Sequence, residues 1–347
     1  MSKSNWGSGE TKYFFELSPD KVLDAVESIG VRATGRLFQL NSMENRVYEV
    51  EIETSESTSK SKWDSRKIIK FYRPGRWSLE QIKDEHTYLN DLRNEEIPVA
   101  NPEKFEDGST VKKLRDLDIY CSVFPRIGGR SPDELNFESY ETIGRILARM
   151  HNVGEKQPAK SRLTLDSTSF GSENLKFIID NGLLPTELRH EYVKTFEKIL
   201  ELSEPHLKKL AYQRIHGDAH LGNLLSVDES FFFVDFDDML MGPTVQDLWL
   251  IIPGIDAESR QFREALLEGY TSLRNFNRSD LKLTETLRAM RLVHFSAWIG
   301  KRFDDPYFKK TFSDYGSWGY WNSQLADLTD QLKLVKDSLQ GSPGEIG

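Results

Sequence analysis

The sequence predicts an α+β protein with a small N-terminal part of mixed structure and a mainly helical C-terminal part. Three observations predict this class. Apolar residues recur at helical spacing over 19–29 and 79–92, which predicts two N-terminal helices. Runs of β-branched and aromatic residues predict strands through 40–72 and near 111–124. Helical spacing then dominates, with helices expected at 140–151, 245–252, 262–273 and 281–299.

The composition bounds the class of protein. The chain has 347 residues, of which 38% are hydrophobic and 29% charged, and this length suits two lobes. It has no run of about eighteen apolar residues and no charged-then-apolar leader, so we expect a cytoplasmic protein without a membrane partner. The formal net charge of −9 disfavours a nucleic-acid partner. We also expect a monomer. The single cysteine, Cys121, lies in an apolar run and is expected to be a buried, unreactive thiol.

The segment HGDAHLGN, residues 216–223, carries the strongest functional signal. Asp218 and Asn223 are five residues apart, which is the interval between the catalytic base and the metal-binding Asn of a protein-kinase catalytic loop. Asp235 follows the apolar run 231–234, where such enzymes place an Asp that holds Mg²⁺. We expect two short strands joined by a polar turn at 227–230. A lone Asp at a strand end usually caps a turn, but the combined pattern predicts a phosphotransferase.

The chemistry of phosphoryl transfer explains this choice of residues. The reaction needs a positioned acceptor hydroxyl and metal ions that neutralise the phosphate oxygens. Mg²⁺ prefers oxygen ligands, which suits the carboxylate of Asp235 and the amide oxygen of Asn223. Asp218 is then left to accept the proton of the hydroxyl. We therefore predict Asp218 and Asp235 as catalytic residues, and Asn223 and Asp235 as metal ligands.

His216 and His220 are four residues apart, which leaves a zinc site open as an alternative. Gly217 and Gly222 disfavour the helix that such a pair needs, because each glycine costs about 1 kcal/mol relative to alanine in a helix. No Glu follows the first His, as it would in HExxH. We expect a buried His216 that fixes the loop, and a His220 that does the same or lies near the phosphates.

A second group of residues lies upstream. Residues 67–72 predict a strand with Lys70 in the place of the VAIK lysine, and Glu85 follows on the predicted helix 79–92. In kinases the Lys contacts the α- and β-phosphates and the Glu holds it in place. The alternative is that both side chains are merely solvated, as Lys on strands and Glu on helices usually are. Their order before HGDAHLGN nevertheless predicts an ion pair between Lys70 and Glu85 at an ATP site.

The turn before this strand lacks the glycine-rich loop of protein kinases, since no glycine lies between Arg36 and Gly75. Residues 41–45 can still present the Ser42 hydroxyl and backbone N–H groups to a phosphate, so one interpretation of this turn is a cover over ATP. A plain hairpin turn is the alternative. Four arginines form either a basic group that offsets the charge of ATP or ordinary surface cations: Arg73, Arg76, Arg126 and Arg130.

We expect an N-terminal ATP-clamping lobe at 10–124, a hinge at 125–130, and a C-terminal lobe at 131–340 for catalysis and acceptor binding. Pro125 and the two glycines after it interrupt the periodicity at the hinge. Two interpretations of Asp247 stay open, a brace for the catalytic loop and an exposed Asp at a helix end.

In this order, the motifs resemble the bacterial stress response kinase A family, which are Ser/Thr protein kinases with the fold of aminoglycoside and choline phosphotransferases. The resemblance covers most of the chain and is carried by LNSMENRVYEV (40–50), IIKFYRPGRWS (68–78), DEH (84–86), IPVANP (97–102), VFPRIGGR (123–130), GRILARMHNVG (144–154), HGDAHLGN (216–223), FFFVDFDD (231–238), MGPTVQDLW (241–249) and LRAMRLVHFSAW (287–298). It implies a two-lobed, protein-kinase-like fold, with Asp218 as proton acceptor, Asn223 and Asp235 on Mg²⁺, and Ser42 beside ATP. The Ser/Thr/Lys-rich segment 53–66 departs from the family as an insertion between two strands.

The expected function is that of an ATP- and Mg²⁺-dependent Ser/Thr protein kinase of a bacterial stress response, with ATP and protein hydroxyls as partners. A small-molecule kinase of the aminoglycoside, choline or homoserine type is the alternative, because the HGDAHLGN loop serves alcohols of every size. A nucleotide-binding pseudoenzyme is the least favoured, because every predicted site residue is present. Autophosphorylation on the Ser and Thr residues of 54–65 is a further hypothesis.

Overall fold

The structure is a computed structural model, and it describes residues 14, 16–54, 61, 63–132, 134–227 and 230–340. The chain divides into two compact units, the first formed by Met1–Pro132 with Gly222–Asp237 and the second by Asp133–Leu221 with Asp238–Gly347. The small antiparallel sheet and the many helices confirm the predicted α+β class. Over these ranges, none of the helices has the length and apolarity needed to cross a membrane.

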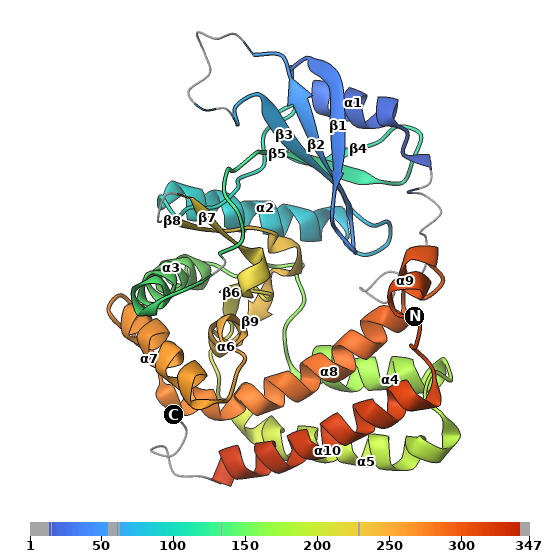
Figure 1. Ribbon diagram of the computed structural model, residues 1–347, viewed down its shortest axis with the longest axis vertical. Helices are drawn as coiled ribbons and strands as arrows, with labels where there is room; N and C mark the ends of the chain where they lie inside the picture. Colours follow the sequence, from blue (N-terminus) through green and yellow to red (C-terminus); the bar gives the residue numbers. More distant parts are fainter. Residues whose placement is uncertain are drawn as a thin grey trace. The chain divides into compact units, whose positions relative to one another are not determined.

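A five-stranded antiparallel sheet of order β1-β2-β3-β5-β4 forms the centre of the first unit (Figure 1). Its strands are β1 (Ala33–Leu40), β2 (Arg46–Ile52), β3 (Arg66–Phe71), β4 (Lys112–Lys113) and β5 (Tyr120–Pro125). The helix α1 (Pro19–Glu27) packs against β1, β2 and β3. The strands expected through 40–72 and near 111–124 are confirmed. Residues 53–65 stand between β2 and β3 in the chain, and their interpretation as an insertion stays a prediction.

The two-residue period of β3 separates the core from a polar face. Ile69 and Phe71 belong to the apolar cluster that the sheet shares with α1. Lys70 lies between them and points to the opposite face, where its ladder partner is Ser122 of β5. Cys121 belongs to the core cluster, and burial raises the pKa of its thiol to about 12, as expected for an unreactive cysteine.

The helix α2 (Leu79–Asn94) is the one expected at 79–92. A capping box starts it: the Ser78 hydroxyl accepts a hydrogen bond from the Gln81 N–H, and the Gln81 side chain accepts one from the Ser78 N–H. Ile82, Glu85 and Leu89 are buried at helical spacing. The apolar face of α2 therefore carries Glu85 into the interior of the first unit.

The strands β7 (Leu224–Val227) and β8 (Ser230–Phe233) form the predicted hairpin, which belongs to the first unit. Gly129 lies against it with φ of +107°, and a Cβ at this position would lie 2.5 Å from the carbonyl oxygen of Ser226. Arg130 N donates to Ser226 O at 3.3 Å, and Ser226 N donates to Arg130 O at 2.8 Å. Only glycine suits such a left-handed position at this distance. The two hydrogen bonds tie the segment that we expect to be a hinge to the hairpin.

Helices make up most of the second unit. They are α3 (Phe137–Glu155), α4 (Glu173–Asp180), α5 (Thr186–Leu207), α6 (Val245–Ile251), α7 (Ala257–Thr271), α8 (Thr284–Gly300), α9 (Pro306–Thr311) and α10 (Trp318–Gln340), with the shorter helical turns η2 (Ser167–Ser172) and η5 (Arg278–Leu283). The turns η3 (Leu221–Asn223) and η4 (Phe236–Asp238) span the two sequence positions at which the chain passes from one unit to the other. The strands β6 (Gln213–Ile215) and β9 (Leu240–Gly242) pair antiparallel. α8 packs against α4, α5 and α10 (Figure 1). The helices expected at 140–151, 245–252 and 262–273 are confirmed, while the one expected at 281–299 begins with η5 before α8.

Two glycines allow α3 and α7 to approach each other closely. A Cβ on Gly144 of α3 would overlap the carbonyl oxygen of Leu266 in α7. A Cβ on Gly269 of α7 would overlap the carbonyl oxygen of Glu141 in α3. Because the obstructing atoms are backbone, no side chain can rotate away, and the helices themselves would have to separate.

We expect Gly144→Ala and Gly269→Ala each to lower the free energy of unfolding by about 1–3 kcal/mol, the usual effect of overpacking a well-packed contact. Gly319→Ala in α10 is the matched control, because only the Ser317 hydroxyl lies near the added Cβ, at 3.9 Å. It should be neutral or stabilise by up to about 1 kcal/mol. Urea unfolding of the three variants measures the difference, and equal stabilities for Gly144→Ala and Gly319→Ala would contradict the close contact.

Candidate active site

Lys70 and Glu85 form the predicted ion pair in the interior of the first unit. The Nζ of Lys70 lies 2.9 Å from Oε1 of Glu85 and 3.3 Å from Oδ1 of Asp237. It also lies over the ring of Tyr72, 4.6 Å from the centroid. β3 supplies the lysine from its polar face and α2 supplies the glutamate from its buried face.

The charge of Lys70 is fixed by these neighbours. Burial lowers the pKa of the amine, but the negative charges around it, Glu85 first and Asp237 and Asp235 after it, hold that pKa well above its ordinary value. Lys70 is therefore a permanent cation. A permanent cation on a polar sheet face suits the binding of a phosphate group.

The β7–β8 hairpin brings Asn223 and Asp235 to the same end. Leu224 pairs with Phe233 in the hairpin, and Val234 N donates a hydrogen bond to Asn223 O at 3.0 Å. Asn223 directly precedes the first strand, and Asp235 follows the second one closely. Asp235 has φ of +60°, a left-handed conformation that non-glycine residues adopt rarely and at a cost on the order of 1 kcal/mol. The backbone is thus held in an uncommon form where the predicted ligand stands.

The donor set of Asn223 and Asp235 fits Mg²⁺. Both offer oxygen, and this ion binds few protein ligands and takes the rest from phosphates and water. No group of three or more His, Cys, Asp or Glu side chains in the described part of the chain is arranged to hold a metal by itself. An ion held by these two residues would take its remaining ligands from phosphate and water.

Asp237 is a buried carboxylate that the sequence did not single out. Its Oδ2 accepts hydrogen bonds from Nη1 of Arg76 at 2.7 Å and from Nδ2 of Asn45 at 3.1 Å. The Glu44 carboxylate lies 3.1 Å from Nε of Arg73 and 3.5 Å from Nη1 of Arg76. Both arginines are buried and paired, so of the two interpretations left open, the structure disfavours ordinary surface cations for Arg73 and Arg76.

The turn at 41–45 is held by side chains in place of glycines. Arg73 N donates to Oδ1 of Asn45 at 3.1 Å, and Nε of Arg73 donates to Glu44 O at 3.0 Å. The Ser42 hydroxyl accepts a hydrogen bond from Asn45 N at 3.3 Å, so it stabilises the turn itself. A contact between Ser42 and ATP stays a prediction.

In the second unit, Asp247 braces the loop that carries Asp218. Its fully buried carboxylate accepts hydrogen bonds from the backbone N–H groups of His216 and Gly217, both at 2.9 Å. Nε2 of His151 lies 3.0 Å from the same carboxylate. Gly217 has φ of +84°, and a Cβ there would overlap the carbonyl oxygen of Asp238. Of the two interpretations left open for Asp247, the structure supports the brace.

Asp218 faces cationic and polar partners in this unit. Nη2 of Arg291 lies 2.8 Å from its Oδ1, and Nε2 of His220 lies 3.3 Å from its Oδ2. Its backbone N–H donates to Nδ1 of His216 at 3.3 Å, so the buried His216 fixes the loop as expected. Burial raises the pKa of the Asp218 carboxyl, but the hydrogen bond from His220 and the charge of Arg291 hold it well below its ordinary value. The group is an anion at neutral pH.

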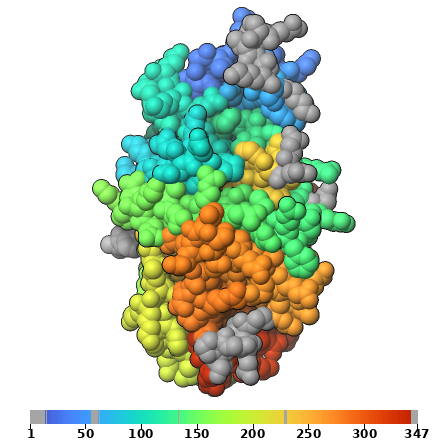
Figure 2. Space-filling view, turned by 90° about the vertical axis from the view of Figure 1, so that its left-hand side faces the viewer, coloured from blue at the N-terminus to red at the C-terminus, as the bar shows by residue number. Residues whose placement is uncertain are grey.

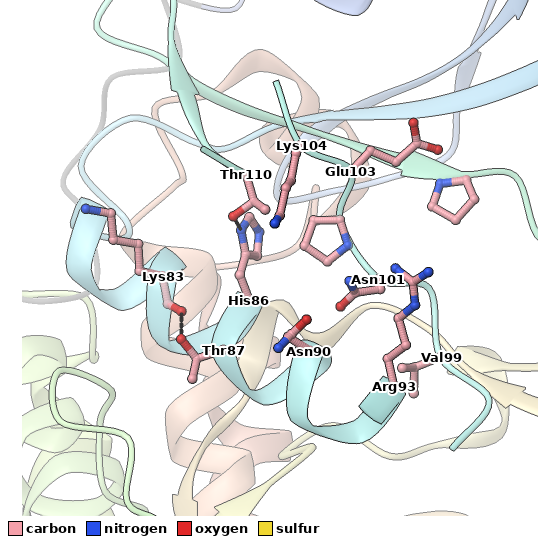
Figure 3. A pocket seen from close by; sticks show the side chains of 12 residues that line it. Lys83, His86, Thr87, Asn90, Arg93, Val99, Asn101, Glu103, Lys104 and Thr110 are labelled. Atoms are coloured by element: carbon pink, nitrogen blue, oxygen red, sulfur yellow. Dashed lines mark hydrogen bonds between the residues drawn. The ribbon is translucent and has the colours of Figure 1, made fainter. Parts of the chain in front are cut away.

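A cavity of about 980 Å³ lies along the outer face of α2 (Figure 3). It is lined by Lys83, His86, Thr87, Asn90, Arg93, Val99, Asn101, Pro102, Glu103, Lys104, Thr110 and Pro125. None of the predicted site residues lines it. His86 connects it to the polar face of the sheet, because its Nε2 lies 3.1 Å from the hydroxyl of Tyr72.

We expect Asp247→Ala to lower the free energy of unfolding by about 3 kcal/mol, because two buried backbone donors lose their acceptor. Asp247→Asn keeps one acceptor oxygen and should lose about half as much. Asp330→Ala serves as control, since that carboxylate pairs with Lys333 at the surface and its loss should stay within about 0.5 kcal/mol. Chemical unfolding measures all three, and an Asp247→Ala protein as stable as the control would remove Asp247 from this role.

Comparison with known proteins identifies the family. The model of the phosphotransferase enzyme family APH matches residues 39–283. Stress response kinase A of Escherichia coli (strain K12) is 37% identical over 326 residues, which cover 93% of this chain and 95% of that protein. Serine/threonine protein kinase RdoA of Salmonella typhimurium (strain LT2) is 35% identical over 326 residues, with the same coverage.

Solved structures agree in fold. Amicoumacin kinase hAmiN, in complex with AMP-PNP, Ca²⁺ and Ami, superposes with a TM-score of 0.74 at 20% identity and covers 93% of this chain and 96% of its own. A microcompartment-associated aminopropanol kinase gives 0.65 at 18% identity, with 92% and 97% covered. The predicted kinase-like fold and the predicted phosphotransferase are confirmed. The chain belongs to the phosphotransferase enzyme family and, within it, to the stress response kinase A proteins.

Proposed function

We propose that this chain is an ATP- and Mg²⁺-dependent kinase that phosphorylates Ser and Thr hydroxyls of proteins in a bacterial stress response. The observation that carries the proposal is the buried Lys70–Glu85 pair beside Asp235 within one unit. The names of the relatives in Escherichia coli and Salmonella typhimurium support the acceptor class and the stress response.

On the nucleotide side, Lys70 binds the α- and β-phosphates and Glu85 keeps the amine in place. Asn223 and Asp235 hold Mg²⁺, which neutralises charge on the phosphate oxygens when it is bound. The turn at 41–45 covers the phosphates, with Ser42 nearest to them. We also propose that 10–124 acts as the ATP-clamping lobe and 125–130 as a hinge, with Gly222–Asp237 working alongside that lobe.

On the acceptor side, Asp218 acts as the base. The acceptor oxygen forms a new bond to the γ-phosphorus, and the bond from that phosphorus to the bridging oxygen of ADP breaks. The hydroxyl proton passes to a carboxylate oxygen of Asp218. Asp247 keeps this loop in position through the N–H groups of His216 and Gly217.

A small-molecule kinase remains the second candidate, because the matching solved structures include amicoumacin and aminopropanol kinases. Their identity to this chain is low, so they support the fold and leave the acceptor open. The partners of Asp218 disfavour amine-bearing alcohols. The guanidinium of Arg291 lies 2.8 Å from an oxygen of Asp218, so an amine on an acceptor bound at Asp218 would lie close to a second positive charge and be repelled by it.

Asp218→Ala should lower turnover by about 10²–10⁴, which corresponds to roughly 3–5 kcal/mol of barrier, and should leave nucleotide affinity nearly unchanged. Asp235→Ala should instead weaken the binding of Mg²⁺-ATP. Nucleotide affinity and turnover are measured for both variants. Full activity of Asp218→Ala, or unchanged nucleotide affinity of Asp235→Ala at all Mg²⁺ concentrations, would contradict these roles.

We expect phosphate to appear on Ser or Thr of protein when the enzyme is incubated with labelled ATP, Mg²⁺ and a bacterial protein extract. Mass spectrometry maps the sites, and Asp218→Ala is the control for contaminating kinases. The hypothesis of autophosphorylation in 54–65 is tested in the same experiment. Residues 55–60 and 62 of this segment lie outside the described residues. If choline, ethanolamine or an aminoglycoside takes up phosphate and no protein does, the small-molecule function replaces this proposal.

A further inference from the structure

The carboxylate of Asp218 is held by side chains that reach into solvent. The side chain of Arg291 is 42% exposed and that of His220 is 40% exposed, while Asp218 itself is 22% exposed. The carboxylate of Asp247 provides the contrast, because its partner His151 is fully buried. A solvent-exposed side chain that pairs with a carboxylate can be displaced by an incoming group, whereas a buried one keeps the surrounding fold in place.

The packing of α8 does not depend on Arg291. The buried face of this helix includes Leu287, Met290 and Val293. Arg288, one turn earlier, pairs with Glu285 at 3.2 Å and donates to Pro253 O at 2.9 Å. Arg288 therefore contacts the surrounding fold, and these contacts do not include Asp218. The part of the chain that includes α7 and α8, drawn in orange, reaches the surface of the second unit (Figure 2).

Arg291 places a positive charge next to Asp218, where an acceptor hydroxyl would bind. An acceptor hydroxyl must come within hydrogen-bond distance of a carboxylate oxygen of Asp218, and the guanidinium already lies 2.8 Å from one of these oxygens. Groups attached near that hydroxyl then lie a few ångströms from a positive charge. The interaction is partly shielded by solvent, so it should change binding by about tenfold in either direction according to the sign of the group.

We propose that Arg291 forms an acceptor subsite that recognises an anion, so that the preferred Ser or Thr lies beside an acidic or phosphorylated residue. A carboxylate or phosphate of the acceptor pairs with the guanidinium of Arg291 when the acceptor hydroxyl binds to Asp218. Bidentate pairing with arginine suits both groups. The inference rests on the proposed function, in which Asp218 is the base and the acceptor is a protein.

The test uses one Ser-containing peptide in versions that carry Glu, phosphoserine, Ala or Lys at each neighbouring position in turn. For the wild-type enzyme we expect kcat/KM for the best Glu or phosphoserine peptide to exceed that for the matching Lys peptide by about tenfold or more. Arg291→Met should reduce this ratio to near one, and Arg291→Glu should invert it. Arg288→Met and Arg288→Glu are the matched controls and should keep the wild-type ratio.

The ratio within one variant separates recognition from folding. A variant that is less stable or less active loses rate on both peptides and keeps the ratio. A wild-type preference for Lys peptides, or an unchanged ratio in Arg291→Met and Arg291→Glu, overturns the subsite.

Small alcohols distinguish failure of the subsite from failure of the proposed function. If peptides are not phosphorylated, the same comparison is made with glycerate, glycerol and ethanolamine. A preference for glycerate that Arg291→Met removes supports the anion subsite while the protein acceptor is wrong. A preference for ethanolamine overturns both. Absence of transfer to every acceptor overturns the proposed function, and the subsite falls with it.

Discussion

The first unit is organised around a buried positive charge. Lys70 is 6% exposed, and an ammonium taken out of water without partners costs several kcal/mol. Glu85 of α2 and Asp237 of the segment after β8 supply the compensating carboxylates. These groups come from distant parts of the sequence, so pairing them fixes α2 and the segment 222–237 against β3. Asn45 extends the network to the turn at 41–45, because it also donates to Asp237. The turn can dispense with glycines because charged and polar side chains determine its conformation.

The second unit uses a buried carboxylate in the same way. Asp247 satisfies the N–H groups of His216 and Gly217, which otherwise would be buried donors without an acceptor. This fixes the backbone just before Asp218 and leaves the Asp218 side chain to partners that solvent reaches. The unit therefore divides two tasks between two aspartates, Asp247 and Asp218. Asp247 holds the backbone of the loop in place, and Asp218 has partners whose side chains are partly exposed to solvent.

The sequence predicted those features whose signal is local. The strand with Lys70, the helix with Glu85 and the hairpin before Asp235 follow from spacing within a few residues, and the structure contains all three. Contacts between distant residues were not predictable in this way. Asp237 lies 167 residues from Lys70 and stands among three aspartates of similar local pattern, so spacing does not say which one is buried. α10 was missed because the residues on its buried face are few and mixed in type, namely Trp321, Leu328, Gln331 and Val335.

The environment of Asp218 bears on how a kinase of this kind would use a weak base. Its carboxyl pKa is held below the ordinary value by His220 and Arg291, so it attracts a proton less strongly than an isolated aspartate. In phosphoryl transfer this is a small loss, because the transition state is loose and catalysis comes almost entirely from positioning and electrostatic stabilisation. The stability that these contacts add is retained at neutral pH and is lost only as the pH falls through the lowered pKa. In the proposed role, a carboxylate that stays ionised orients the acceptor hydroxyl at every turnover. In the proposed subsite, the guanidinium that lowers the basicity of Asp218 also selects the acceptor, and both properties would then have one physical origin.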